Sequence, residues 1–266
     1  MNKKHIALTA LCLLAAVGCS AAETGSAQED GVAEADGTTA EAFATIEVGE
    51  QQVTFFDSGD GGILVGSAKS NFDPEFAIVQ LERTAGMELT PLELFSALAP
   101  GEAAPEQLVE DHAARVAALG RADATVLQIA YEPQQLIEKA WTPTQCDNAL
   151  GLTAAGVIRR NNQLVIDYCT ANLTASPGCE TYVPTARHRA GVCNNSPTLS
   201  MTTKAHTRDT SSSWRTSTAS VVPNGSYLWT AWGRLNGDLT QWIPSKLRLQ
   251  AWAADSNWFH ARLAPN

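Results

Sequence analysis

The spacing of apolar residues changes twice along this chain. Residues 6–17 form one unbroken, mostly apolar run behind the basic start Asn2-Lys3-Lys4. Residues 20–42 are polar or small and contain no apolar side chain larger than that of Val32. From Phe43 onward, apolar residues recur at spacings of two or of three to four, the periods of strands and helices. The pattern predicts a leader, a polar segment and a folded body.

The body begins with alternation typical of strands. Residues 43–48 and 52–56 flank Gly49-Glu50 and predict a hairpin, and a turn over 57–62 leads into a further strand over 63–67. Residues 76–83 alternate Ala77, Val79 and Leu81 with other residues and predict another strand. A last strand is expected over 125–131, with Leu127, Ile129 and Tyr131 on one side.

Two helices are expected between these strands. Thr90, Pro91 and Glu93 are typical of a helix start, because the threonine can cap the first turn and the glutamate can complete a capping box. Residues 105–119 predict a second helix with Leu108, Val109, Ala113, Val116 and Leu119 inward and Gly120 at its end. We expect His112 to have a packing role. The fold class predicted for 43–140 is α+β, an antiparallel sheet with two helices.

The remainder, 141–266, predicts mostly strands. Asn161-Asn162 and Pro223-Asn224-Gly225 are expected hairpin turns. Apolar rows follow alternate positions of the later strands: Met201, Thr203, Ala205 and Thr207, then Leu247, Leu249, Ala251 and Ala253, then Phe259, Ala261 and Leu263. This pattern is typical of a small antiparallel sandwich or barrel.

Charge supports a division of the body at residue 140. Residues 20–140 carry 22 acidic and 5 basic side chains, whereas residues 141–266 carry 6 acidic and 11 basic ones. All 7 Trp residues lie in the second part. We therefore expect two folding units, an α+β domain over 43–140 and a Cys- and Trp-rich β domain over 141–266.

The leader ends in the quartet Ala16-Val17-Gly18-Cys19. A basic start followed by an apolar run too short to span a bilayer is typical of an export signal. The quartet resembles the lipobox of bacterial lipoproteins, although Ala16 stands where Leu is usual. The resemblance implies removal of 1–18, lipidation of Cys19, a membrane partner through that lipid and, with Ser20 following, the outer membrane. Cleavage near Ala21 or Ala22 as an ordinary signal peptide is the alternative. Residues 19–42 are then expected to be a lipidated Cys and a disordered acidic tether.

The cysteines fit the same interpretation. With Cys12 removed and Cys19 lipidated, four remain: Cys146, Cys169, Cys179 and Cys193. An even number in an exported chain predicts two disulfides, and four cysteines allow three pairings. The sequence order favours Cys146–Cys169 and Cys179–Cys193. No C-x-x-C motif is present, so we predict no zinc or other metal site.

Motifs for catalysis are absent from the sequence. The chain has no G-x-S-x-G, H-E-x-x-H, G-x-x-x-x-G-K, G-x-G-x-x-G or S-x-x-K. We predict no catalytic residues and no cofactor, and a non-enzymatic protein is favoured over an enzyme. A site assembled only in space, as in a hydrolase, stays open. Nucleic acid is not an expected partner, because the net charge is −10.

Candidate chemistry lies on the polar side of the late strands. In three strands, polar or aromatic residues alternate with the apolar row. These residues are Lys246, Arg248, Gln250 and Trp252 in one strand, Trp258, His260 and Arg262 in the last, and Lys204, His206 and Arg208 in an earlier one. Trp beside basic residues can hold a sugar ring or an anionic polymer. The ligand-binding candidates are Trp252, Trp258, Arg248, His260 and Arg262. The alternative is an ordinary solvated sheet face. Arg187-His188-Arg189 is expected to be a solvated loop.

Together these features predict an envelope lipoprotein of uncharacterised role. We expect a binding module, at the cell surface or in the periplasm, for a glycan or another envelope protein. An exported hydrolase and a purely structural or assembly lipoprotein are the alternatives.

Overall fold

The computed structural model describes residues 38–59, 61–70, 75–132, 142–152, 156–160, 166–168, 181–183, 187–209, 214–238, 245–252 and 258–265. Cys19, Cys169 and Cys179 lie outside these residues. Among the helices of the described part, none has the length and apolar character needed to cross a membrane.

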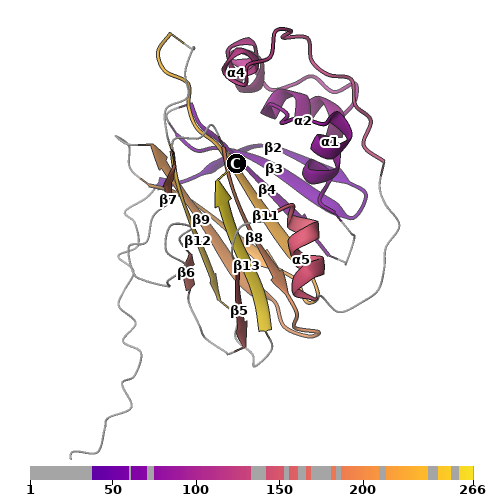
Figure 1. Cartoon of the computed structure of the whole chain (residues 1–266), viewed down its shortest axis with the longest axis vertical. Coiled ribbons are helices and arrows are strands. Elements are labelled where there is room, and N and C mark those ends of the chain that lie inside the picture. The colour runs from indigo at the N-terminus through magenta and orange to yellow at the C-terminus, as the bar shows by residue number, and fades with distance from the viewer. Residues whose placement is uncertain are drawn as a thin grey trace, which may run out of the picture. The chain divides into compact units, whose positions relative to one another are not determined.

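The described strands form two sheets. The larger has seven of these strands, and every neighbouring pair in it is antiparallel. In spatial order the strands are β2 (Glu41–Val48), β3 (Gln51–Asp57), β4 (Ile63–Lys69), β11 (Ser226–Trp232), β8 (Arg187–Asn194), β13 (Trp258–Pro265) and β5 (Gly156–Arg160). Strands from both ends of the chain therefore lie side by side in one sheet (Figure 1).

The smaller sheet has six strands. Its main order is β1 (Thr38–Thr39), β10 (Arg215–Val221), β9 (Met201–Asp209), β12 (Ser245–Trp252) and β6 (Ile166–Tyr168), and β7 (Thr181–Val183) also pairs with β12. The pairing of β1 with β10 is parallel, and the others are antiparallel. The second part of the chain is thus mainly strand, as the sequence predicts.

Five helices are present among the described residues: α1 (Ala77–Ala85), α2 (Pro91–Leu98), α3 (Glu106–Val109), α4 (His112–Ala118) and α5 (Pro143–Leu150). Figure 1 shows α1 and α2 beside β2, β3 and β4, and α5 beside β8 and β13. The predicted capping box of α2 is confirmed. Thr90 Oγ1 accepts a hydrogen bond from the backbone N–H of Glu93, whose carboxylate accepts one from the N–H of Thr90.

Apolar clusters lie on both faces of the seven-stranded sheet. On one face, Val53, Phe55, Ile63 and Val65 pack against Leu94 and other residues of the helices. The other face supplies Leu64, Ala190, Val192 and Trp229 to a cluster with Met201, Ala205, Leu247 and Leu249 of the six-stranded sheet. Neighbouring residues of β4 thus belong to different clusters, because strand side chains alternate in direction.

Glycine permits two of the closest approaches in this core. A Cβ on Gly66 would lie 2.3 Å from the Tyr227 hydroxyl and 2.9 Å from the Trp229 ring, and one on Gly191 would lie 2.3 Å from the Leu150 side chain. Leu150 belongs to α5, so Gly191 is what allows this helix to lie directly on β8.

The N-terminal hairpin and the strand after it agree with prediction, since β2 pairs with β3 and β3 with β4. The predicted strand over 76–83 is wrong, because Ala77–Ala85 is helix α1. Ile78 and Leu81 are both buried, and a three-residue spacing places two side chains on one face only in a helix. Gly86, with φ 67°, ends the helix in the left-handed region.

The predicted helix over 105–119 is interrupted. It forms as α3 and α4, and Asp111 between them has φ −106° and ψ 0°. Val109, predicted to be inward, is 53% exposed, whereas Arg115 is buried. Arg115 donates hydrogen bonds to Asp111 Oδ2 and to the carbonyls of Gly61 and Gly233. Leu108 and Val116 are buried as predicted, so Arg115 and its polar contacts share the inward side of α4 with the apolar residue Val116.

The predicted strand over 125–131 does not form a ladder. The segment is irregular in the structure, although Leu127, Ile129 and Tyr131 pack against the helical cluster on the predicted side. The Tyr131 hydroxyl accepts a hydrogen bond from Gln51 Nε2 at 2.9 Å. The period of two places these side chains correctly, but no strand of the described residues pairs with this segment.

Both predicted hairpins of the second part are wrong. β5 belongs to the seven-stranded sheet and β6 to the six-stranded one, so the strands beside Asn161-Asn162 do not pair with each other. The turn at Pro223-Asn224-Gly225 does form, with φ 52° at Asn224, but it joins β10 of one sheet to β11 of the other. A turn residue reports local backbone geometry and not the sheet to which the next strand belongs.

The structure also corrects the disulfide pairing. Cys146 of α5 is bonded to Cys193 of β8, so Cys146–Cys169 and Cys179–Cys193 are excluded. Cys146, Ala149 and Leu150 pack with Cys193 and Leu228 in a small apolar cluster. The packing of α5 on β8 brings together two cysteines that are 47 residues apart.

The polar segment is shorter than the predicted 19–42, because β1 begins at Thr38 and β2 at Glu41. The backbone N–H of Ala40 donates to the carbonyl of Thr216 at 3.0 Å. The division at residue 140 stays a prediction. Across it, β4 and β11 pair over their full length within one sheet.

Candidate functional site

The five predicted ligand-binding residues are divided between the two sheets. Arg248 and Trp252 belong to β12 of the six-stranded sheet, whereas Trp258, His260 and Arg262 belong to β13 of the seven-stranded sheet. Strand pairing therefore does not bring them onto one sheet face. Of the five, only Arg248 has its side chain within the described part of the structure.

Arg248 lies in a polar cluster on one face of the six-stranded sheet, opposite to its apolar row. The cluster consists of His206 (β9), Trp214, Thr216 (β10), Arg248 and Gln250 (β12), and we call it the β12 polar cluster. In the ladder, Arg248 pairs with His206, and His206 pairs with Thr216. Three neighbouring strands thus supply four of the side chains, and Trp214 directly precedes β10.

Hydrogen bonds fix the imidazole of this cluster. His206 Nε2 lies 2.9 Å from Gln250 Oε1, and His206 Nδ1 lies 2.8 Å from Thr216 Oγ1. Because an amide oxygen can only accept, Nε2 carries the proton, and in the neutral ring Nδ1 accepts from the Thr216 hydroxyl. Trp214 meets the His206 ring edge-on, with centroids 6.3 Å apart.

The guanidinium of Arg248 lies over the ring of Trp214, 5.4 Å from its centroid. Arg248 is only 6% exposed, and its Nε has no hydrogen-bond partner. No acidic side chain of the described residues pairs with it. The arrangement places a positively charged donor over an indole and next to the Gln250 amide, and such groups can bind an anion or a sugar hydroxyl.

A second charged cluster overturns one expectation. Arg187-His188-Arg189 is not a solvated loop, because all three residues are buried in β8. The Glu82 carboxylate of α1 accepts hydrogen bonds from both Arg187 and Arg189, and Glu88 lies 3.2 Å from Arg187. These contacts join α1 to β8.

The electrostatics of this cluster favour the charged forms of its members. Burial raises the pKa of Glu82, but the charges and hydrogen bonds of Arg189 and Arg187 lower it by more, so the net shift is downward. Burial and the neighbouring charge of Arg187 lower the pKa of Arg189 to about 10. Arg189 therefore remains protonated at neutral pH, and the cluster is a structural ion-pair network.

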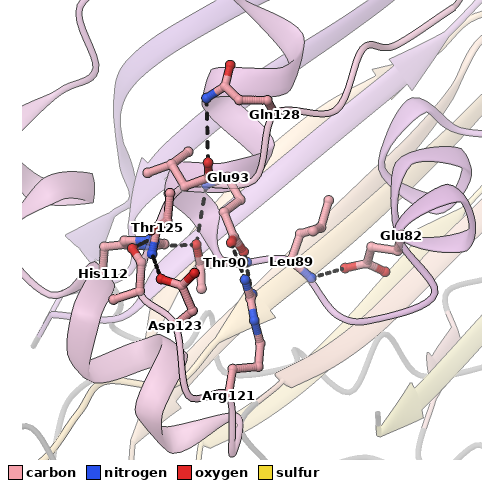
Figure 2. Close-up of polar contacts among 11 residues, drawn as sticks. Glu82, Leu89, Thr90, Glu93, His112, Arg121, Asp123, Thr125 and Gln128 are labelled. Atoms are coloured by element: carbon pink, nitrogen blue, oxygen red, sulfur yellow. Dashed lines mark hydrogen bonds and ion pairs between the residues drawn. The ribbon is translucent and has the colours of Figure 1, made fainter.

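Figure 2 shows a third network, around the start of α2. The Glu93 carboxylate points toward Arg121, with Nη1 at 2.7 Å from Oε2 and Nη2 at 2.5 Å from Oε1. Thr90 Oγ1 lies 2.9 Å from His112 Nδ1, and His112 Nε2 lies 2.9 Å from the carbonyl of Ala124. Burial raises the pKa of Glu93, and the bonds from Arg121 and Thr90 lower it by more, with a net downward shift.

The hydroxyl–imidazole pair of this network does not have the arrangement of a nucleophile and its base. Since a carbonyl can only accept, His112 Nε2 donates to Ala124 and Nδ1 is left to accept from the Thr90 hydroxyl. Thr90 Oγ1 also accepts from the Glu93 N–H, and Thr90 is 1% exposed. A buried hydroxyl engaged on both sides caps a helix, so His112 has the expected packing role.

No group of His, Cys, Asp and Glu suited to a metal ion occurs among the described residues.

Trp214 and Thr216 were not among the sequence candidates. Their participation depends on the register between β9, β10 and β12, which the sequence pattern does not report. The sequence feature that comes closest to indicating this cluster is the alternation of Lys204, His206 and Arg208, which places polar residues opposite the apolar row of β9.

Comparison with protein-family models, with curated proteins and with solved structures finds no match to this chain.

Proposed function

We propose that this chain is an exported bacterial lipoprotein that acts as a non-enzymatic binding module for an envelope glycan. The observation that carries the binding role is the β12 polar cluster, in which Arg248 lies over Trp214 beside Gln250. A guanidinium lying over an indole, beside an amide, suits hydrogen bonding to the oxygen atoms of a sugar.

The surroundings of the cluster support a surface role. On the same face of the six-stranded sheet, Thr202, Lys204 and Thr216 are half-buried, and Thr218 and Ser220 are exposed. This polar strip adjoins the recessed Arg248 and Gln250 side chains. In the ladder, Trp252 follows Gln250 by two positions along β12 and pairs with Thr202.

Anchoring and location are parts of the same proposal. The lipobox-like quartet ending at Cys19 supports a lipid anchor, Ser20 supports the outer membrane, and residues 19–37 suit a tether between lipid and body. For the body, we propose that the two sheets pack as a sandwich, supported by the apolar cluster that both sheets supply.

The binding role is tested with the full chain, expressed with its leader and purified from membranes. Isolated envelope polysaccharides and peptidoglycan are used to pull down the protein, and retention is compared for the native chain, Trp214→Ala and Trp252→Ala. We expect native retention and loss in at least one variant. Absence of retention, or equal retention of all three, contradicts the proposal.

The anchor is tested separately by mass spectrometry of the mature N-terminus. We expect the chain to begin at Cys19 and to carry the added mass of acyl chains. A mature chain that begins at another residue without lipid contradicts the anchoring but leaves the binding experiment valid.

A further inference from the structure

We infer that Arg248 forms a subsite for a carboxylate of an acidic polysaccharide. The inference rests on the proposed glycan-binding function and names the chemical class of the ligand. It begins from a contrast among the buried arginines of this chain.

Four arginines are buried in the described residues: Arg115, Arg187, Arg189 and Arg248. The first three pair with acidic side chains, Arg115 with Asp111 and both Arg187 and Arg189 with Glu82. Arg248 has no such partner in the described structure, and its Nε makes no hydrogen bond. A buried guanidinium without a counterion is costly. Arg248 therefore differs from the other three buried arginines, each of which has an acidic partner.

The guanidinium lies among side chains that are themselves fixed by hydrogen bonds and ring contacts. Trp214 lies beneath it at 5.4 Å, and His206, which pairs with Arg248 in the ladder, is itself held by Gln250 and Thr216. Because the positions of these neighbours are already set, a ligand would not have to order the Arg248 side chain. A planar, pre-oriented guanidinium suits the two oxygens of a carboxylate.

Gln250 supplies a second donor. Its Oε1 accepts from His206, which leaves the Nε2 hydrogens directed away from that bond, and Nε2 has no hydrogen-bond partner among the described residues. An amide donor beside the guanidinium can bind a sugar hydroxyl or ring oxygen next to the carboxylate. The half-buried Lys204, paired with Gln250 in the ladder, adds positive charge along the same strip. A uronic acid unit carries both kinds of acceptor.

The experiment measures binding of tetragalacturonate to the full chain by calorimetry, with its methyl ester as the uncharged counterpart. We expect the native chain to bind the acid at least tenfold more tightly than the ester. Arg248→Met is expected to weaken binding of the acid at least tenfold, and Arg248→Lys, which keeps the charge but not the planar fork, about threefold to tenfold.

Arg83→Ala is the matched control, because Arg83 is an exposed arginine of α1 paired with Glu75. It removes one positive charge far from the β12 ladder, and binding of the acid should stay within twofold of native. An equal loss in Arg83→Ala and Arg248→Met would reduce the effect to net charge and overturn the subsite.

Other outcomes are equally decisive. Equal binding of acid and ester by the native chain overturns the inference whether or not Arg248→Met folds, since no variant is needed. Displacement of tetragalacturonate by an equal concentration of inorganic phosphate overturns the carboxylate assignment in favour of phosphate. A native chain that retains neutral envelope glycans but not tetragalacturonate overturns the subsite alone, whereas retention of no polymer contradicts the proposed function.

Discussion

Asn194 holds the corner at which the chain passes between the two sheets. Its amide nitrogen lies 2.9 Å from the carbonyl of Leu199, 3.1 Å from that of Val221 and 3.0 Å from that of Val222. Its Oδ1 accepts from the N–H of Ser196 at 2.9 Å. Asn194 is 1% exposed, so one side chain satisfies backbone groups that water cannot reach.

Asn194→Asp is therefore a sharp test of this corner. The change keeps the size but sets a carboxylate against three carbonyl oxygens. We expect the free energy of unfolding to fall by about 2–4 kcal/mol, because buried donors to backbone carbonyls are replaced by repulsion. Urea denaturation measures it. The same change at the exposed Asn148 should cost less than about 0.5 kcal/mol, and equal costs would refute the role of the corner.

Glu82 makes stability depend on pH. Its pKa is lowered in the folded state from an ordinary value of 4.5. The stabilisation is thus fully present above that value and is lost as the pH falls from about 4.5 through the folded pKa. Glu93, whose pKa is also lowered, adds to the same loss.

For Glu82→Gln we expect a loss of about 3–5 kcal/mol at pH 7, because two buried arginines lose their shared carboxylate. The fall in stability between pH 5 and pH 3 should also become shallower than in the native chain. Denaturation at a series of pH values measures both effects. Glu102→Gln, at an exposed loop position, should change neither, and an unchanged pH slope in Glu82→Gln would contradict the assignment.

Among the elements, helices α2 and α5 begin with the same capping motif. Each has a threonine cap, a proline at the first turn and a reciprocal bond with the third helical residue, Glu93 in α2 and Gln145 in α5. Their surroundings differ. Thr90 is buried and also bonded to His112, whereas Thr142 is exposed.

Thr90→Ala and Thr142→Ala form a matched pair within one chain. Loss of the exposed Thr142 cap should cost about 1 kcal/mol. Loss of Thr90 should cost about 2–4 kcal/mol, because the buried His112 nitrogen loses its partner as well. Chemical denaturation of both variants under one condition gives the comparison. If the two costs are the same, the network in Figure 2 contributes nothing beyond the cap.

In the whole molecule, the Cys146–Cys193 bond links α5 to β8, an inner strand of the seven-stranded sheet. Replacing both cysteines by alanine should cost about 4 kcal/mol, the loop-entropy value for a closure of 47 residues. Thermal denaturation measures the loss. Non-reducing peptide mapping should recover the 146–193 peptide pair, and a 146–169 pair would contradict the structure.

The same map tests the remaining cysteines. If Cys19 carries lipid and Cys12 is removed, Cys169 and Cys179 are the two left, and a bond between them stays a prediction of the export hypothesis. Free thiols at both positions in the purified native chain would count against an oxidising compartment.

The amino-acid sequence alone determines those features of this protein that depend on local interactions. The cap of α2, the hairpin of β2 and β3, and the apolar rows of β9 and β12 depend on neighbours close in sequence, so residue order alone predicts them. The charged candidate Arg248 was found in the same way, as the polar alternate of an apolar row.

Contacts distant in sequence decided the rest. A period of two does not tell which of two sheets receives a strand, so the separation of β12 from β13, and with it of Trp252 from Trp258, required the full ladder order. The partner of Cys146 and the burial of Arg187 and Arg189 likewise depend on where α5 and α1 pack on β8. The pairing of His206 with Arg248 arises only from register, because residues 42 positions apart become neighbours when two strands align.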